Sequence, residues 1–242
     1  MRRPRVLVTL GDPAGVGPEV IAAALADEQL PAEVDFEVLG DASCGQPGHP
    51  DDRSAREALR ALELAASRLT HEDADAVVTG PVSKSGLEAV GFRHPGQTEF
   101  FARSLGCEDY AMCLSGESLT VGLATIHIPL SAVPTTLSVG SIVRSGRLLA
   151  EFICRRRGRR PRIAVAGLNP HAGEGGRFGD EERQLIAPAV ARLNELDVAD
   201  FSGPAVPDAV FREAAAGRFD AVVAMYHDQG LIPLKLLDFD HA

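Results

Sequence analysis

Three histidines, His127, His171 and His227, each lie within or directly after an apolar stretch rich in Val and Ala. The stretches are VGLATIHIP at 121–129, RIAVAGLNPHAG at 162–173 and AVVAMYHDQGLIPLK at 221–235. Continuous apolar runs are typical of strands buried on both faces of a parallel sheet, whose carboxyl ends share one edge. Three neutral imidazoles at one edge suit Zn²⁺ or a similar divalent ion with an open coordination position. This convergence is inferred from the expected sheet, because the spacing is not a short-range motif.

Two charged residues accompany the third histidine. Asp228 directly follows His227 and could orient it as an outer carboxylate or bind a substrate amine. Lys235 could reach an anion or act as an acid or base, with an exposed lysine of no special role as the alternative. The remaining histidines lack this placement and are interpreted as surface groups: His49, His71, His94 and His241.

Two further strand ends fit the same pattern, in RVLVTLGDPAGVGPE at 5–19 and DAVVTGPVSK at 75–84. The first glycine-bearing turn leads into a helix start, where free backbone N–H groups favour an anion, although a tight turn without a ligand is the alternative. Its spacing is not the Gly-x-Gly-x-x-Gly of dinucleotide-binding turns, so Rossmann binding is not supported. Lys84, beyond the second strand, is either a surface cation or a phosphate contact.

The segments between these strands predict the rest of the fold. Residues 94–106 indicate a loop entering a helix, with Thr98 as a cap. Residues 110–129 indicate an antiparallel hairpin turning at 115–117, and 201–220 a loop followed by a short helix. The glycine-rich stretch 169–182 is a loop of the kind that carries function. Its last acids, at 180–182, stand where a helix start favours negative charge, which favours capping over catalysis for them.

Composition excludes several classes of protein. A net charge of −10 argues against a nucleic-acid surface, and the basic run RRRGRRPR at 155–162 is interpreted as a helix C-terminus and a solvated connection. The four cysteines show no Cys-x-x-Cys spacing and predict reduced thiols in a cytoplasmic protein. No apolar run approaches the roughly 18 residues of a membrane span, so no membrane partner is expected.

Six segments, taken in order, carry a family resemblance: GDPAGVGPE, VTGPVSKSG, PGQTEFFA, ATIHIPL, LNPHAGEGGRFGDEE and YHDQGLIPLK. Together they resemble the 4-hydroxythreonine-4-phosphate dehydrogenase family of pyridoxal phosphate biosynthesis. The resemblance implies a two-domain α/β/α subunit similar to isocitrate and isopropylmalate dehydrogenases, with mostly parallel sheets and a cleft between domains. Residues 1–93 would form the N-terminal α/β domain and residues 94–242 the metal-binding and dimerisation domain. It also implies a homodimer with a shared active site.

The resemblance assigns roles residue by residue. It implies metal ligation by His127, His171 and His227, drawn from both subunits. The implied substrate contacts are Gln97, Thr98 and Lys235, and the implied catalytic residues are Lys235, Asp228 and Asp208.

The implied reaction is NAD- or NADP-dependent oxidation of 4-phosphohydroxy-L-threonine to 2-amino-3-oxo-4-phosphooxybutanoate. That product would decarboxylate to 3-amino-2-oxopropyl phosphate. The expected divalent metal is Zn²⁺, with Mg²⁺ or Co²⁺ as alternatives.

Two departures from the family pattern keep other functions open. Gln97 stands where the family usually has His, and Gln donates a hydrogen bond but carries no charge. The chain ends at Ala242, where relatives continue with a segment expected to complete the N-terminal domain. The alternatives are a dehydrogenase of erythronate or threonate 4-phosphate, a metal-dependent hydrolase, and a truncated metal-binding remnant without activity.

Overall fold

The computed structural model describes residues 2–239 and divides the chain into two compact units, Met1–Glu108 and Asp109–Ala242. The sequence predicted the division after Arg93. The observed division falls later because helix α4 (Gln97–Ser104) belongs to the first unit, where its Phe100 joins a buried cluster with Leu62.

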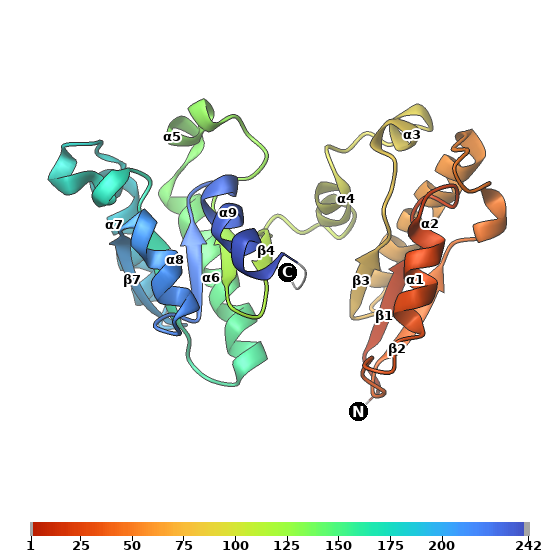
Figure 1. Cartoon of the computed structure of the whole chain (residues 1–242), viewed down its shortest axis with the longest axis horizontal. Coiled ribbons are helices and arrows are strands. Elements are labelled where there is room, and N and C mark those ends of the chain that lie inside the picture. The colour runs from red at the N-terminus through yellow and green to blue at the C-terminus, as the bar shows by residue number, and fades with distance from the viewer. Residues whose placement is uncertain (1, 240–242) are drawn as a thin grey trace. The chain divides into compact units, whose positions relative to one another are not determined.

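The first unit is built on a small parallel sheet with strand order β2-β1-β3 (Figure 1). The strands are β1 (Arg5–Thr9), β2 (Asp35–Leu39) and β3 (Ala76–Thr79). The helices are α1 (Gly17–Leu25), η1 (Ala42–Cys44), α2 (Asp52–Thr70), α3 (Lys84–Ala89) and α4. Successive side chains of β1 point to opposite faces of the sheet. Leu7 packs in a cluster with α2, whereas Val8 packs with Ile21 of α1.

Local sequence explains two features of this unit. Helix α2 begins with a capping box, in which the side chains of Asp51 and Ser54 each accept a hydrogen bond from the other's backbone N–H. The turn between β1 and α1 requires glycine, because a Cβ at Gly17 would lie 2.2 Å from the Leu10 carbonyl oxygen. The glycine-bearing turn predicted from the sequence is therefore a close approach of two backbone segments.

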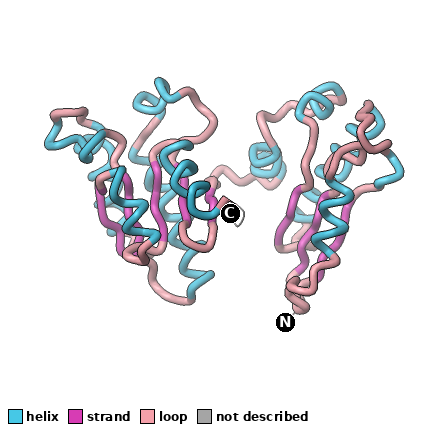
Figure 2. Tube along the Cα trace, viewed as in Figure 1, coloured by secondary structure: helices cyan, strands magenta, loops and turns pink. Residues whose placement is uncertain are grey.

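The second unit contains a five-stranded sheet of order β4-β5-β8-β6-β7, parallel except for β4. Figure 1 labels its two outer strands, β4 and β7, and Figure 2 distinguishes strands from helices by colour. The strands are β4 (Cys113–Ser115), β5 (Thr120–Leu123), β6 (Arg162–Ala166), β7 (Asp200–Ala205) and β8 (Ala221–Ala224). The helices are η2 (Leu130–Ala132), α5 (Val133–Thr136), α6 (Val139–Arg157), η3 (Pro170–Gly176), η4 (Glu182–Ile186), α7 (Ala187–Glu195), α8 (Pro207–Ala215) and α9 (His227–Asp238).

Helices cover both faces of this sheet, which gives the α/β architecture predicted from the apolar runs. One buried cluster joins α6 and α7 to the sheet through Ile142, Leu193 and Val223. The other joins α8 and α9 through Phe211, Leu234 and Val222. Because neighbouring residues of β8 point to opposite faces, every residue of this central strand is buried.

Most predicted elements are confirmed, including the antiparallel β4–β5 hairpin. Two predictions are wrong. The stretch 201–205, predicted as a loop, forms most of β7, an edge strand parallel to β6, where the sheet tolerates Pro204. Thr98 is not a cap, because α4 starts after Gly96 and receives no side-chain capping bond. Within residues 2–239, no helix combines the length and the apolar character needed to cross a membrane.

Candidate active site at the carboxyl edge of the second sheet

The three histidines follow neighbouring strands, as predicted. Strands β5, β8 and β6 are adjacent and parallel, so their carboxyl ends lie along one edge. His127 follows β5, His227 is the first residue of α9 after β8, and His171 lies in the turn η3 after β6. This edge is where open α/β sheets bind ligands.

His127 and His227 form a pair. Their ring centroids are 5.5 Å apart, and both line a cavity of about 360 Å³. His227 Nδ1 lies 2.7 Å from Asp228 Oδ1, a hydrogen-bonding distance. With Nδ1 engaged by a carboxylate, the Nε2 atom of His227 is the nitrogen available to a metal or substrate.

His171 lies in an unusual backbone conformation. Five consecutive residues, 171–175, have positive φ, and three of them are not glycine: His171 at 52°, Ala172 at 51° and Glu174 at 42°. Such backbone costs roughly 1–2 kcal/mol for each non-glycine residue and persists only where surrounding contacts hold it. His171 lines a second, mostly apolar cavity of about 810 Å³ together with Asp208 and Asp228. Asp228 therefore lines both cavities of the edge.

Glu182 holds the start of this turn. Its buried carboxylate accepts hydrogen bonds from Leu168 N at 2.8 Å, Asn169 N at 2.7 Å and Asn169 Nδ2 at 3.0 Å. Capping was the role predicted for this acid, but its partners are two backbone N–H groups and the Asn169 side chain upstream of the turn, and not the start of its own helix. The sequence alone did not reveal this contact, because it joins residues more than ten positions apart.

The donors of one chain fit part of a divalent metal site. Two imidazoles lie side by side, one of them oriented by a carboxylate, and imidazole nitrogen is a suitable ligand for Zn²⁺. Within the described part of one chain, no three or more His, Cys, Asp or Glu side chains gather closely enough to hold a metal ion. The convergence of all three histidines on one ion, with ligands from two subunits, stays a prediction.

The other predicted site residues are dispersed. Lys235 lies on the exposed surface of α9, eight positions after His227, and lines neither edge cavity. In the first unit, Gln97 lines a cavity of about 240 Å³ with Lys84 and His94, and its Oε1 atom is buried without a hydrogen-bond partner. Thr98 is exposed on the same helix.

The histidines interpreted as surface groups behave differently from one another. His49 and His71 are exposed, as predicted. His94 is half-buried, with its ring centroid 5.2 Å from that of Phe92 and 5.3 Å from that of Phe100, so its assignment to the surface is wrong. The prediction for His241 lies outside the described residues.

The fold of the two units and the histidines at the carboxyl edge of the second sheet define an α/β protein that is closely similar in structure to known dehydrogenases. The crystal structure of 4-hydroxythreonine-4-phosphate dehydrogenase from Klebsiella pneumoniae matches with a TM-score of 0.85 and 36% sequence identity, over 98% of this chain and 85% of that one. The chain belongs to the PdxA family, since the family model for pyridoxal phosphate biosynthetic protein PdxA matches residues 17–242.

Curated relatives within this family carry two different names. The 4-hydroxythreonine-4-phosphate dehydrogenase of Erythrobacter litoralis is 42% identical, over 96% of this chain and 82% of its own length. The D-threonate 4-phosphate dehydrogenase of Pectobacterium atrosepticum is 35% identical, over 97% of this chain and 84% of its own length. Both names describe dehydrogenases of phosphorylated four-carbon hydroxy acids.

Proposed function

We propose that the protein is an NAD- or NADP-dependent dehydrogenase that oxidises 4-phosphohydroxy-L-threonine with the help of a divalent metal. The observation that carries this proposal is the His127–His227 pair with Asp228, placed at the carboxyl edge of the sheet where α/β proteins bind ligands. The chain is also 42% identical to a protein named 4-hydroxythreonine-4-phosphate dehydrogenase. D-threonate 4-phosphate is the second candidate substrate, because several relatives are named for it.

His127, His227 and Asp228 have separate roles in this proposal. His127 and His227 present ring nitrogens at one cavity, and Asp228 Oδ1 accepts the Nδ1 proton of His227. This hydrogen bond keeps the Nε2 lone pair directed away from Asp228. A bound divalent ion would supply Lewis-acid stabilisation of a substrate hydroxyl oxygen, and nicotinamide would supply the hydride acceptor.

The remaining assignments concern substrate recognition and proton removal. Gln97, with its unpartnered oxygen, and Thr98 would bind the substrate in the first unit. Lys235 would accept the hydroxyl proton, and Asp208 would act near His171 in the larger cavity. We propose that the working form is a homodimer in which His171 is contributed by the other subunit.

The direct test supplies each phosphorylated acid with NAD or NADP and Zn²⁺, Mg²⁺ or Co²⁺, and measures reduced nicotinamide by absorbance. We expect reduction with 4-phosphohydroxy-L-threonine, and loss of at least tenfold in kcat for His127→Ala. Absence of reduction with every substrate and metal would overturn the proposal. Phosphate release without nicotinamide would instead favour a metal-dependent hydrolase.

A mixing experiment tests the shared site. His127→Ala and His171→Ala are each expected to be inactive alone. If the two histidines serve one site from different subunits, a mixed dimer contains one intact site and regains up to about half of the specific activity per mixed dimer. No recovery after mixing and proven subunit exchange would place both histidines in the same subunit's site.

A further inference from the structure

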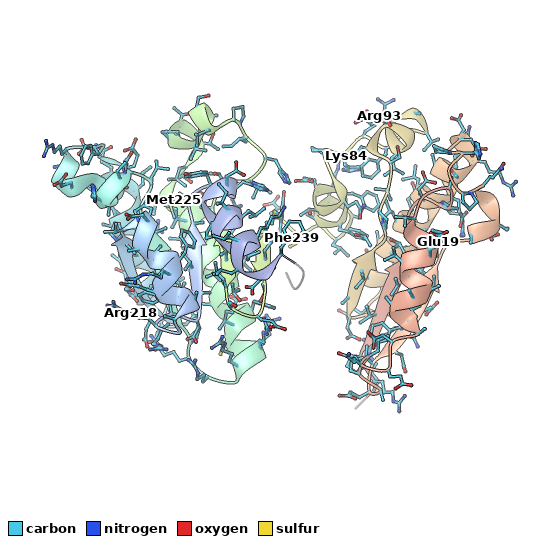
Figure 3. The ribbon with its side chains drawn as sticks, in the orientation of Figure 1. Glu19, Lys84, Arg93, Arg218, Met225 and Phe239 are labelled. Atoms are coloured by element: carbon cyan, nitrogen blue, oxygen red, sulfur yellow. The ribbon has the colours of Figure 1, made fainter. Side chains whose placement is uncertain are left out.

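A continuous series of hydrogen bonds runs across the carboxyl edge of the second sheet. Thr125 Oγ1 donates to Met225 O at 2.7 Å, which joins the segment after β5 to the end of β8. Met225 N donates to Gln229 Oε1 at 2.6 Å, and Gln229 Nε2 donates to Gly167 O at 2.7 Å, directly after β6. Figure 3 labels Met225, at the point where β8 gives way to α9. This edge series thus ties together the three strands that precede the histidines.

Gln229 is the central member of the edge series and has no free polar atom. Its side chain is buried, with 9% of the residue exposed, and its two ends bond to one backbone N–H and one backbone C=O. These partners fix the orientation of the amide, because an N–H requires the oxygen and a C=O requires the nitrogen. Gln229 borders the larger cavity, but both polar atoms of its side chain already have backbone partners.

The two hydrogen bonds of the Gln229 side chain lie close in sequence to His227 and His171. Gln229 lies in the first turn of α9, two residues after His227, and the N-cap of this helix, Tyr226, makes no side-chain capping bond. Gln229 itself therefore fixes the helix start against the strand that precedes it. At its other end it holds Gly167, four residues before His171.

We propose that Gln229 is a positioning residue for the histidine edge: its carboxamide sets the register between the start of α9, with His227, and the loop that carries His171. This inference rests on the proposed function for its catalytic consequence, although the positioning itself is a property of the fold. Removing the carboxamide leaves Met225 N–H and Gly167 C=O buried without partners, which favours a local shift of both segments. Outer groups that orient active-site imidazoles typically change affinity or activity by about 10–100-fold.

The test compares two substitutions at Gln229 with a matched control. Gln229→Met keeps the volume and removes both hydrogen bonds, whereas Gln229→Glu keeps the acceptor for Met225 N–H and presents oxygen to the Gly167 carbonyl. The control is Asn194→Leu, because Asn194 also bonds through its amide to one backbone N–H and one C=O, both of Phe201 near the amino end of β7, away from the histidines. Thermal unfolding first establishes that each variant is folded.

Two readouts separate positioning from a general loss of stability. We expect kcat to fall at least tenfold in both Gln229 variants while KM changes by less than threefold, and both to stay near wild type in Asn194→Leu. We also expect the imidazole NMR resonances of His127 and His227 to move in the Gln229 variants, whereas those of His49 and His71, in the other unit, do not. If Gln229→Met does not fold, Gln229→Glu decides the question alone.

Folded Gln229 variants with kcat within twofold of wild type and unshifted imidazole resonances would overturn the positioning role. A wild-type protein that oxidises none of the substrates would overturn the proposed function instead. The resonance comparison would then still decide whether Gln229 positions His227, because it needs no turnover.

Discussion

At the scale of single residues, the contact between His227 and Asp228 is the most informative feature of the edge. A carboxylate hydrogen-bonded to one nitrogen of an imidazole fixes the tautomer and raises the basicity of the other nitrogen. Asp228 is exposed and makes this contact at 2.7 Å. Its side chain adds little to the packing of the core, and we propose that it orients His227 and contacts ligands in the two cavities.

We expect Asp228→Asn to weaken the binding of Zn²⁺ by roughly 10–100-fold while the free energy of unfolding changes by less than about 1 kcal/mol. Competition with a chromogenic chelator measures the first quantity, and urea unfolding of the metal-free protein the second. Asp52→Asn is the matched control, since Asp52 is an exposed carboxylate paired with Arg56 on α2. An Asp228→Asn protein with wild-type Zn²⁺ affinity would show that His227 does not depend on this contact.

At the scale of elements, the left-handed turn at 171–175 depends on the first residue of the helix that follows it, Glu182 of η4. The Glu182 carboxylate both accepts three hydrogen bonds from Leu168 and Asn169 and fills the space beside the turn, where a Cβ at Gly173 would lie 2.6 Å from Glu182 Oε2. One hydrogen bond to a charged acceptor contributes about 1.5–3 kcal/mol to stability, which is comparable with the roughly 1–2 kcal/mol that each strained non-glycine residue costs.

We therefore expect Glu182→Gln to lower the free energy of unfolding by about 1–3 kcal/mol and to speed hydrogen exchange at the Leu168 and Asn169 amides. Chemical unfolding and native-state hydrogen exchange provide the two measurements. Glu181→Gln serves as the control, because Glu181 accepts a bond from the Asn169 side chain but holds no backbone N–H of this loop. Equal effects of the two substitutions would contradict the anchoring role of Glu182.

The arginine-rich segment after α6 is a second element whose structure depends on one buried acid. The helix ends at Arg157 with Gly158 in the left-handed region, as the predicted helix C-terminus requires. Asp220 accepts bonds from Arg157 at 2.7 Å, from Arg159 at 2.6 Å and 2.9 Å, and from the Arg162 N–H at 2.8 Å. Several of these cations are thus structural ties between α6, β6 and β8.

The pKa of Asp220 makes this tie dependent on pH. Burial alone would raise the pKa of the carboxyl, but the hydrogen bonds from Arg159 and the Arg162 N–H and the charges of Arg159 and Arg157 outweigh it, so the pKa is lowered. A lowered carboxyl pKa contributes stability above the ordinary Asp value of about 4, and this stability is lost as pH falls through the folded-state pKa.

We expect Asp220→Asn to lower the free energy of unfolding by about 1–3 kcal/mol at pH 7, with the difference from wild type shrinking as the pH falls below about 4. Urea unfolding across this range measures both effects. Asp200→Asn, which removes an exposed partner of Arg160, is expected to cost less than about 1 kcal/mol at any pH. A difference for Asp220→Asn that does not vary with pH would contradict the ionic origin of the stabilisation.

These elements show which parts of the structure the sequence could predict. Strands β5, β6 and β8 were predictable because both of their faces are buried, which makes the runs continuously apolar. Strand β7 was not, because it lies at the edge, exposes several side chains and contains Gly203 and Pro204. Its pairing with β6 is decided by tertiary contacts that leave no local pattern.

The same distinction holds for the candidate site. The placement of the three histidines followed from strand ends alone. The contacts of Glu182 and Gln229 were not predictable, because each joins its side chain to backbone groups more than ten positions away, at 168–169 and 167. Whether Lys235 and Gln97 act as the family resemblance implies depends on a ligand, and these assignments stay predictions.

At the scale of the whole molecule, the cores of the two units are separate. Among residues 2–239, each buried hydrophobic cluster lies within one unit: those around Leu62, Leu7 and Val8 in the first, and those around Ile163 and Val222 in the second. A unit with its own hydrophobic core meets a main requirement for a domain that folds alone. The second unit also carries the histidine edge and the whole edge series through Thr125, Met225, Gln229 and Gly167.

We therefore expect residues 109–242 to fold without the first unit. Circular dichroism should show a single cooperative thermal transition, and the imidazole resonances of His127 and His227 should match those of the full chain, because their contacts come from this unit. Residues 94–242, which begin at the boundary predicted from the sequence, provide the comparison. They carry α4 without the α2 surface that covers Phe100, so this longer fragment should expose apolar surface and bind a hydrophobic dye more strongly. A fragment 109–242 that melts without cooperativity would show that the histidine edge depends on the first unit, despite the separation of the cores.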